Sequence, residues 1–225
     1  MRPLTFLALL LAACNGPDVD TDTGNDTDDD TDTETGTDID TETTGSLNVY
    51  AYSSSACASS ETVLAGTPAS EDGHWTAVGM SPDEDMNVTR VSISLFNGTS
   101  EASNTACDAS LASTVDLYVT DGSAPPNNAT PDDTIAVPTE NVPGNERILN
   151  LATNLDVASN ETLWVTLKMT ATTGASTCVR TCNDNTHDDD NFWSNASEQP
   201  YAWSAFPSIG LSGTTQFFSA HGEAL

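Results

Sequence analysis

The sequence has few basic residues and few aromatic residues, and it contains no long hydrophobic run. Lys and Arg together number 5 among 225 residues, against 34 Asp and Glu, which gives a formal net charge of −29. A chain with so few cations is repelled by nucleic-acid phosphates, so we expect no nucleic-acid partner. The longest apolar run, Leu4 to Ala13, is too short for a membrane-spanning helix of about 20 residues.

Recognisable catalytic motifs are absent as well. The three histidines, His74, His187 and His221, are scattered, and the chain contains no GxSxG, no HExxH and no phosphate-binding glycine loop. Acidic pairs are so abundant that they lose the specificity of a glycosidase signature. We therefore expect a protein that is not an enzyme. A secreted hydrolase is a remote third alternative, which would need two carboxylates, or a nucleophile and a base, in one cleft.

The amino terminus has the pattern of an export signal. Arg2 supplies a positive charge, and the apolar run that follows it has the length of a signal-peptide core. The run ends in the letters LAAC at Cys14, which resembles the lipobox of bacterial lipoproteins. This resemblance implies cleavage before Cys14 and attachment of lipid to its thiol, with acyl chains that each contribute about 0.8 kcal/mol per buried CH₂. The alternative, an ordinary secretory signal with a chance cysteine, is opposed by the polar residues that begin at Asn15.

A low-complexity acidic segment follows, over residues 15–45. It holds 12 acids and no base between Asp18 and Glu42, and its only aliphatic residues are Val19 and Ile39. Such a segment cannot bury enough apolar surface to fold, and like charges extend it. Fully stretched it reaches about 100 Å, so we expect a spacer. Asp/Thr-rich tethers directly after a lipobox resemble those of myxobacterial and related lipoproteins.

The rest of the chain predicts strands separated by turns. The clearest strand is Met86–Phe96, where Val91, Ile93 and Leu95 alternate with polar residues. Two more runs, Thr114–Val119 and Glu161–Met169, repeat this alternation. The shorter candidates are Leu47–Tyr52, His74–Gly79, Thr134–Val137, Arg147–Leu151, Asn191–Ser194, Pro200–Ser204 and Thr215–His221. Many short antiparallel strands with turn signals between them predict an all-β sandwich, most simply a jelly roll.

The order of these segments also resembles the jelly-roll modules of secreted bacterial proteins. The resemblance rests on the runs MNVTRVSISLF, VDLYVTDG and ETLWVTLKM, on the tryptophan-rich loop FWSNASEQPYAWSAF and on the final strand TQFFSAHG. It covers roughly residues 70–225. It implies the fold alone, because such modules share no activity. The predicted organisation is a signal peptide at 1–13, the lipidated Cys14 and a disordered acidic linker at 14–45, and a β-sandwich domain at 46–225.

Four cysteines remain once Cys14 is assigned to the lipid, and an even number in an exported domain predicts two disulfides. Of the three possible pairings we favour Cys57–Cys107 with Cys178–Cys182. The alternative is a zinc site, because Cys178, Cys182 and His187 have the spacing of metal ligands. Thiols in an oxidising compartment tend to form disulfides instead.

Two neighbouring segments are candidate ligand sites. The loop 183–191 is rich in oxygen ligands, and Asp184, Asp188 and Asp190 are its best candidates for calcium, the one cofactor considered; the alternative is a solvated acidic turn. The next segment carries aromatic residues, of which Trp193, Tyr201 and Trp203 are candidates to stack on sugar rings. The alternative is that these rings belong to a buried core.

These patterns together favour a monomeric lipoprotein of the bacterial cell envelope, at the outer membrane or cell surface. We expect its sandwich to serve in recognition, adhesion or surface structure without catalysis. Its partners would be the membrane, through the lipid, and a surface glycan or protein. The alternative is a calcium-assisted carbohydrate-binding module. Exposed, coplanar aromatic rings would favour this alternative, whereas buried rings would favour the first interpretation.

Overall fold

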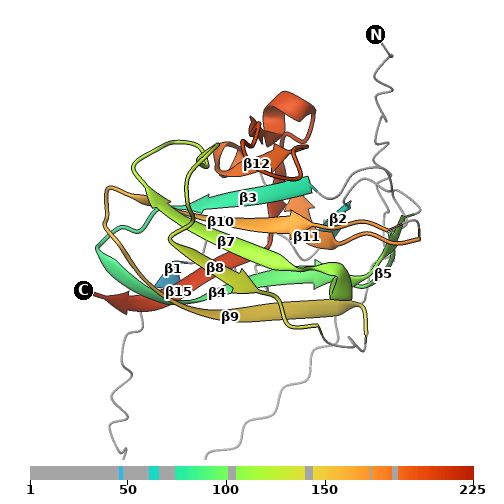
Figure 1. Cartoon of the computed structure of the whole chain (residues 1–225), viewed down its shortest axis with the longest axis horizontal. Helices are drawn as coiled ribbons and strands as arrows, with labels where there is room; N and C mark the ends of the chain where they lie inside the picture. The colour runs from blue at the N-terminus through green and yellow to red at the C-terminus, as the bar shows by residue number, and fades with distance from the viewer. Residues whose placement is uncertain are drawn as a thin grey trace, which may run out of the picture. The chain divides into compact units, whose positions relative to one another are not determined.

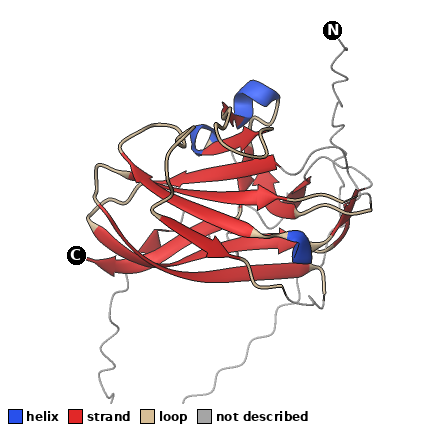
Figure 2. Ribbon diagram, viewed as in Figure 1, coloured by secondary structure: helices blue, strands red, loops and turns tan. Residues whose placement is uncertain are grey.

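The computed structural model describes residues 46–47, 61–65, 74–100, 105–139, 144–172, 174–183 and 187–225. The predicted signal peptide at 1–13, Cys14 and the linker at 14–45 lie outside these residues. The described part is all-β, with three short 3-10 turns and no α-helix (Figure 2). No helix in this part is long and apolar enough to cross a membrane.

A six-stranded antiparallel sheet forms one layer of the fold (Figure 1). Its central strands β3, β10 and β7 pair along most of their lengths. The strand order, from one edge to the other, is β13 (Ser204–Ala205), β12 (Asn191–Ser194), β3 (His74–Met80), β10 (Thr162–Met169), β7 (Thr114–Thr120) and β8 (Asp133–Ala136).

A seven-stranded antiparallel sheet forms the second layer. Its main order is β1 (Ser46–Leu47), β15 (Phe218–Ala224), β4 (Met86–Phe96), β11 (Cys178–Asn183) and β14 (Thr214–Gln216). Two further strands join this sheet, because β2 (Glu61–Ala65) pairs with β11 and β9 (Glu146–Val157) pairs with β4. A separate hairpin joins β5 (Gly98–Ser100) to β6 (Thr105–Cys107).

The chain alternates between the two sheets along the sequence. Strand β3 belongs to the six-stranded sheet, β4 to the seven-stranded sheet, and β7 with β8 to the six-stranded sheet again. Strands β9, β10 and β11 then alternate singly, before β12 with β13 join the six-stranded sheet and β14 with β15 the seven-stranded sheet. This is the connectivity of a jelly roll, in which each crossing closes the sandwich. The predicted fold class, an antiparallel β-sandwich of jelly-roll type, is confirmed.

The core between the sheets is built by period-two alternation. Val91, Ile93 and Leu95 of β4 are fully buried, as are Leu163, Val165 and Leu167 of β10. Because successive side chains of a strand point to opposite faces, each of these runs turns one face to the core. Full burial of each such side chain contributes about 1.5–3 kcal/mol. The sequence pattern therefore determines which face of each strand is internal.

The predicted strands agree with the structure at the strongly alternating runs. Met86–Phe96 and Asn191–Ser194 have the predicted bounds, whereas the strand predicted at Pro200–Ser204 begins only at Ser204. The run predicted at Thr215–His221 forms two strands, β14 and β15, which pair with different neighbours. Strand β11 is not among the predicted strands, because the two cysteines of its sequence CVRTC favour a tight disulfide loop.

The favoured cysteine pairing is wrong. A disulfide joins Cys107 of β6 to Cys178 of β11, so neither Cys57–Cys107 nor Cys178–Cys182 is present. The physical reason is that Cys178 and Cys182 lie on one extended strand, about 13 Å apart at 3.3 Å per residue, whereas a disulfide needs Cα atoms within about 7 Å. Cys182 is disulfide-bonded as well. Both thiols of the alternative zinc site are thus already in disulfides.

Candidate functional site

The outer face of the six-stranded sheet gathers polar and aromatic side chains from four strands and one loop. Cross-strand partners share a face, and the register pairs Lys168 with Trp75 and Asp116 with both Thr166 and Thr134. Since Leu167 and Leu117 on the same strands point to the core, these residues point away from it. We call Trp75, Asp116, Thr134, Thr166 and Lys168, together with Tyr201 from the loop before β13, the Asp116 face.

Asp116 is the buried acid of this face, with 7% of its surface exposed. Its Oδ1 accepts a hydrogen bond from Thr134 Oγ1 at 2.8 Å, and its backbone carbonyl accepts one from Thr166 Oγ1 at 3.0 Å. Burial raises the pKa of Asp116 above its ordinary value, while the Thr134 bond and the charge of Lys168 act in the opposite direction. In the described part of the chain the second carboxylate oxygen, Oδ2, has no hydrogen-bond partner.

Lys168 and Tyr201 add a cationic donor and a hydroxyl to the face. Lys168 is half-buried, and no carboxylate among the described residues forms an ion pair with it. The Tyr201 ring is 6% exposed, yet within the described residues its hydroxyl has no hydrogen-bond partner either. Burial raises the pKa of Tyr201, and the neighbouring groups of Tyr118 and Asp116 raise it further. The face thus offers an acceptor, a hydroxyl and an ammonium group whose hydrogen bonds are unused.

An aromatic cluster occupies the rest of the outer face. Trp164 and Phe192 meet edge to face with ring centroids 5.3 Å apart, and Tyr118 packs in the same buried cluster. Burial, followed by the charge of Asp116, raises the pKa of Tyr118 to about 12. Gly79 makes room for the Trp164 ring, because a Cβ at this position would lie 2.6 Å from Trp164 Cζ3. The cluster is a second hydrophobic core, outside the sandwich.

Two loops, 121–132 and 195–203, are hydrogen-bonded to each other over this second core. Tyr201 N donates to Asn127 O at 2.7 Å, and the Trp203 indole N–H donates to Pro126 O at 3.0 Å. Gln199 Nε2 donates to Ala129 O at 2.7 Å. The Trp75 indole N–H donates to Ser197 O at 3.0 Å and ties the second loop to β3. These bonds hold the aromatic loop in a defined conformation beside Asp116.

The three aromatic residues predicted to stack on sugars do not form one platform. Trp193 lies on the core side of β12, where it stacks on His74 at 5.2 Å, whereas Trp203 packs on the outer face. Adjacent residues of a strand point to opposite faces, so Phe192 faces outward and Trp193 cannot. Tyr201 and Trp203 are tilted by 55° relative to each other. These three rings therefore do not form the exposed, coplanar platform that sugar stacking requires. Tyr201 is buried, as the alternative interpretation predicts.

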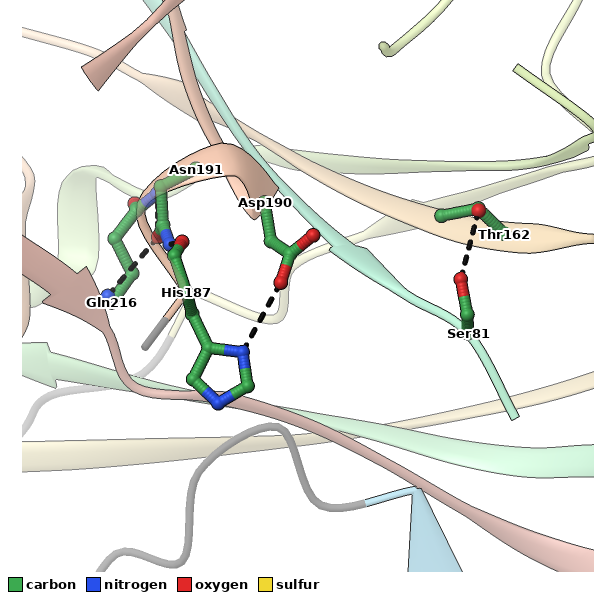
Figure 3. A network of polar contacts seen from close by, with 6 residues as sticks. All are labelled: Ser81, Thr162, His187, Asp190, Asn191 and Gln216. Carbon is green, nitrogen blue, oxygen red and sulfur yellow. Dashed lines mark hydrogen bonds and ion pairs between the residues drawn. The ribbon is translucent and has the colours of Figure 1, made fainter. Parts of the chain in front are cut away.

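The acidic loop is anchored by a polar network that the sequence did not reveal (Figure 3). His187 Nδ1 contacts Asp190 Oδ2 at 3.1 Å, and Asn191 Nδ2 donates to His187 O at 2.8 Å. The buried side chains of Asn191 and Gln216 are hydrogen-bonded at 3.2 Å, and Thr76 Oγ1 donates to Gln216 Oε1 at 2.7 Å. The network fixes the end of the loop to three strands.

The calcium prediction is left untested by this arrangement. Asp184 and the side chain of Asp188 lie outside the described residues, while Asp190 is half-buried beside His187. Among the residues that the structure does describe, no three His, Cys, Asp or Glu side chains are grouped closely enough to hold a metal ion.

Most of the Asp116 face could not be identified from the sequence. Asp116 and Lys168 occur at the outward positions of two predicted strands, between apolar neighbours, and this was the only available signal. Their proximity depends on which strands pair, and strand pairing cannot be deduced from alternation. Comparisons with protein-family models, with curated proteins and with solved structures found no match for this chain.

Proposed function

We propose that the chain is a lipoprotein of the bacterial cell envelope, anchored through Cys14, that displays its jelly-roll domain for non-catalytic recognition. The observation that carries the proposal is the Cys107–Cys178 disulfide. Structural disulfides persist in exported proteins and are rare in the cytosol. An exported, disulfide-bonded domain is what a leader ending in LAAC would deliver, and the acidic segment after Cys14 supplies a spacer.

The Asp116 face supports recognition as the role. Ligand sites combine apolar walls with a few polar groups that fix the ligand. Here Asp116, Lys168 and Tyr201 supply such groups, and the Trp75 ring packs against Tyr201 and lies opposite Lys168. Asp116 is the only buried carboxylate among the described residues. Glycoside hydrolysis uses a pair of carboxyl groups about 5–10 Å apart, so a single acid fits binding better than cleavage.

Membrane anchoring is tested by replacing the lipidated residue. Cys14→Ala should abolish incorporation of labelled palmitate and move the protein from the membrane fraction to the soluble fraction. Asn15→Ala, one residue further on, should keep both label and location, because it leaves the thiol in place. Persistence of the Cys14→Ala protein in the membrane fraction would refute lipid anchoring.

A second candidate function, carbohydrate binding, is favoured by the free groups of the Asp116 face. Sugar hydroxyls donate to a carboxylate and accept from an ammonium group, and both partners are present in Asp116 and Lys168. Titration of neutral oligosaccharides into the purified chain should then give heat that Asp116→Asn removes. The exposed Asp121→Asn is the matched control, since it removes the same charge outside the face. Equal heats for both variants would exclude this face as a sugar site.

The calcium part of this candidate concerns the 184–190 loop. A stoichiometric calcium isotherm that is lost in Asp188→Ala and Asp190→Ala would support a calcium-assisted module. Diffuse heat that is unchanged in both variants would identify the loop as solvated surface.

A further inference from the structure

We propose that the free edge of β9 is a docking site for an extended peptide segment with basic residues, which adds to the seven-stranded sheet as a further strand. This inference concerns the opposite sheet from the Asp116 face and does not depend on that face. It extends the proposed function from small-ligand recognition to a protein partner.

Strand β9 has a neighbour on one side only. It pairs with β4 from Glu146 to Val157, and no strand in the described part of the chain pairs with its other side. In Figure 1 it runs as a long yellow strand along the margin of the fold. The register with β4 is continuous from Glu146 to Ala152 and shifts beyond Ala152. An uninterrupted segment of this length is a template for strand addition.

The direction of the free backbone groups follows from two hydrogen bonds of the neighbouring strand. Ser94 N donates to Phe217 O, away from β9, whereas Asn97 N donates to Asn145 O, in the direction of β9. In an antiparallel pair, opposed residues alternate between exchanging both hydrogen bonds and exchanging none. Ser94 is opposite Ile148 and Ser92 is opposite Asn150, so these two pairs exchange none. The N–H and C=O groups of Ile148 and Asn150 therefore point outward.

The same residues direct their side chains to solvent. Ile148 is 44% exposed, and Asn150 and Ala152 are exposed as well. Natural edge strands are often blocked by lysine or proline, and neither residue type occurs between Glu146 and Val157. Ile148, Asn150 and Ala152 carry no charge, so none of these exposed side chains opposes the addition of a further strand.

The strand is held rigidly from its inner side. Leu149 and Leu151 are buried in the core. Arg147 is 7% exposed, and its guanidinium donates to Ala109 O at 3.0 Å and to Pro138 O. Thr153 Oγ1 donates to Asp133 Oδ2 at 2.7 Å and ties β9 to the edge strand β8 of the other sheet. A preformed edge loses little conformational entropy when a partner strand docks.

The charges at this edge identify the occupant. Strands β8 and β9 carry three acids, Asp133, Glu146 and Asp156. Glu146 is ion-paired with Arg180 of β11, whereas Asp133 and Asp156 have no Lys or Arg partner among the described residues. Arg147, the one cation within these two strands, is buried and donates to Ala109 O and Pro138 O, so it presents no charge to an acidic segment. A second copy of the chain would bring the same acids against them, and each copy has a net charge of −29. A segment with Lys or Arg at its ends and alternating apolar residues is complementary in charge and in pattern.

The test uses the synthetic peptide Lys-Thr-Val-Thr-Val-Thr-Lys and the same peptide with both Lys replaced by Glu. The basic peptide should protect the amides of Ile148 and Asn150 from hydrogen exchange in the full chain, and the acidic peptide should not. Asn150→Pro removes one outward N–H and should weaken binding about tenfold. Asn150→Val loses the same side-chain bond to Ser92 but keeps the N–H, so its affinity should match the wild type.

A second pair of variants guards against a folding defect in Asn150→Pro. Ile148→Lys places a cation against the basic peptide and should weaken binding, whereas Ile148→Glu should not. The proposal is overturned if neither amide is protected, if both peptides bind equally, or if the chain sediments as a dimer that Ile148→Lys dissociates. Asp116→Asn should leave peptide binding unchanged, which separates this site from the proposed recognition face.

Discussion

At the scale of single residues, the outer face of the six-stranded sheet depends on close contacts that leave little room for change. Trp164 is 2% exposed and rests against Gly79, while Asp116 is buried with one carboxylate oxygen free. A substitution at Gly79 changes the volume available to the Trp164 ring, whereas a substitution at Asp116 removes a buried ionisable group. The two residues therefore give separate predictions.

Gly79→Ala should destabilise the domain by about 1–3 kcal/mol, because the added Cβ overlaps a buried indole that has no space to move. The measurement is denaturant unfolding. Gly174→Ala is the matched control, since nothing lies within 4 Å of its added Cβ. Equal stability of the two variants would mean that Trp164 does not pack on Gly79.

The pKa of Asp116 predicts a pH dependence of stability. Burial raises this pKa in the folded state, so between the ordinary value of 3.8 and the raised value the folded protein binds more protons than the unfolded chain. Stability contributed by Asp116 is therefore fully present below pH 3.8 and is lost as the pH rises through the folded-state pKa. Asp116→Asn should remove this loss, as measured by unfolding free energy against pH for both proteins. The unfolding free energy of the wild type minus that of Asp116→Asn should therefore fall as the pH rises through the folded-state pKa. A difference that stays constant or rises with pH would contradict the raised pKa of Asp116.

At the scale of elements, alternation of apolar and polar residues predicted the long strands. It did not predict which strands pair with each other, and strand pairing determines which side chains become neighbours. Met86–Phe96 could be predicted because its apolar positions recur with period two and one face meets the core. Strand β11 could not, since two cysteines four positions apart suggested a loop. The Asp116 face was likewise hidden, because Asp116 and Lys168 come from strands that are distant in sequence. Local pattern determines which way a side chain points, but only the register determines its neighbours.

The disulfides that join strands of the fold can be tested by peptide mapping. Peptide mapping without reduction should recover Cys107 linked to Cys178. Cys182 is also bonded, and once Cys14 carries lipid the sequence leaves Cys57 as its partner, so a second linked pair should contain Cys57 and Cys182. Replacing Cys107 and Cys178 together by Ala should cost about 4 kcal/mol, because their loop spans 71 residues. Recovery of a Cys178–Cys182 peptide would contradict the structure.

At the scale of the whole molecule, charge and connectivity act together. The net charge of −29 favours basic partners and makes their association sensitive to salt. The jelly-roll connectivity places the Asp116 face and the β9 edge on different sheets, so the two proposed binding events would not compete.

Surface display is the central claim, and protease treatment of intact cells tests it most directly. An endoprotease that cleaves before Asp should cut the acidic segment after Cys14 and release the disulfide-bonded domain into the medium while the cells remain whole. Cells that carry Cys14→Ala should have no anchored domain to release. Retention of the domain until the cells are lysed would contradict surface display.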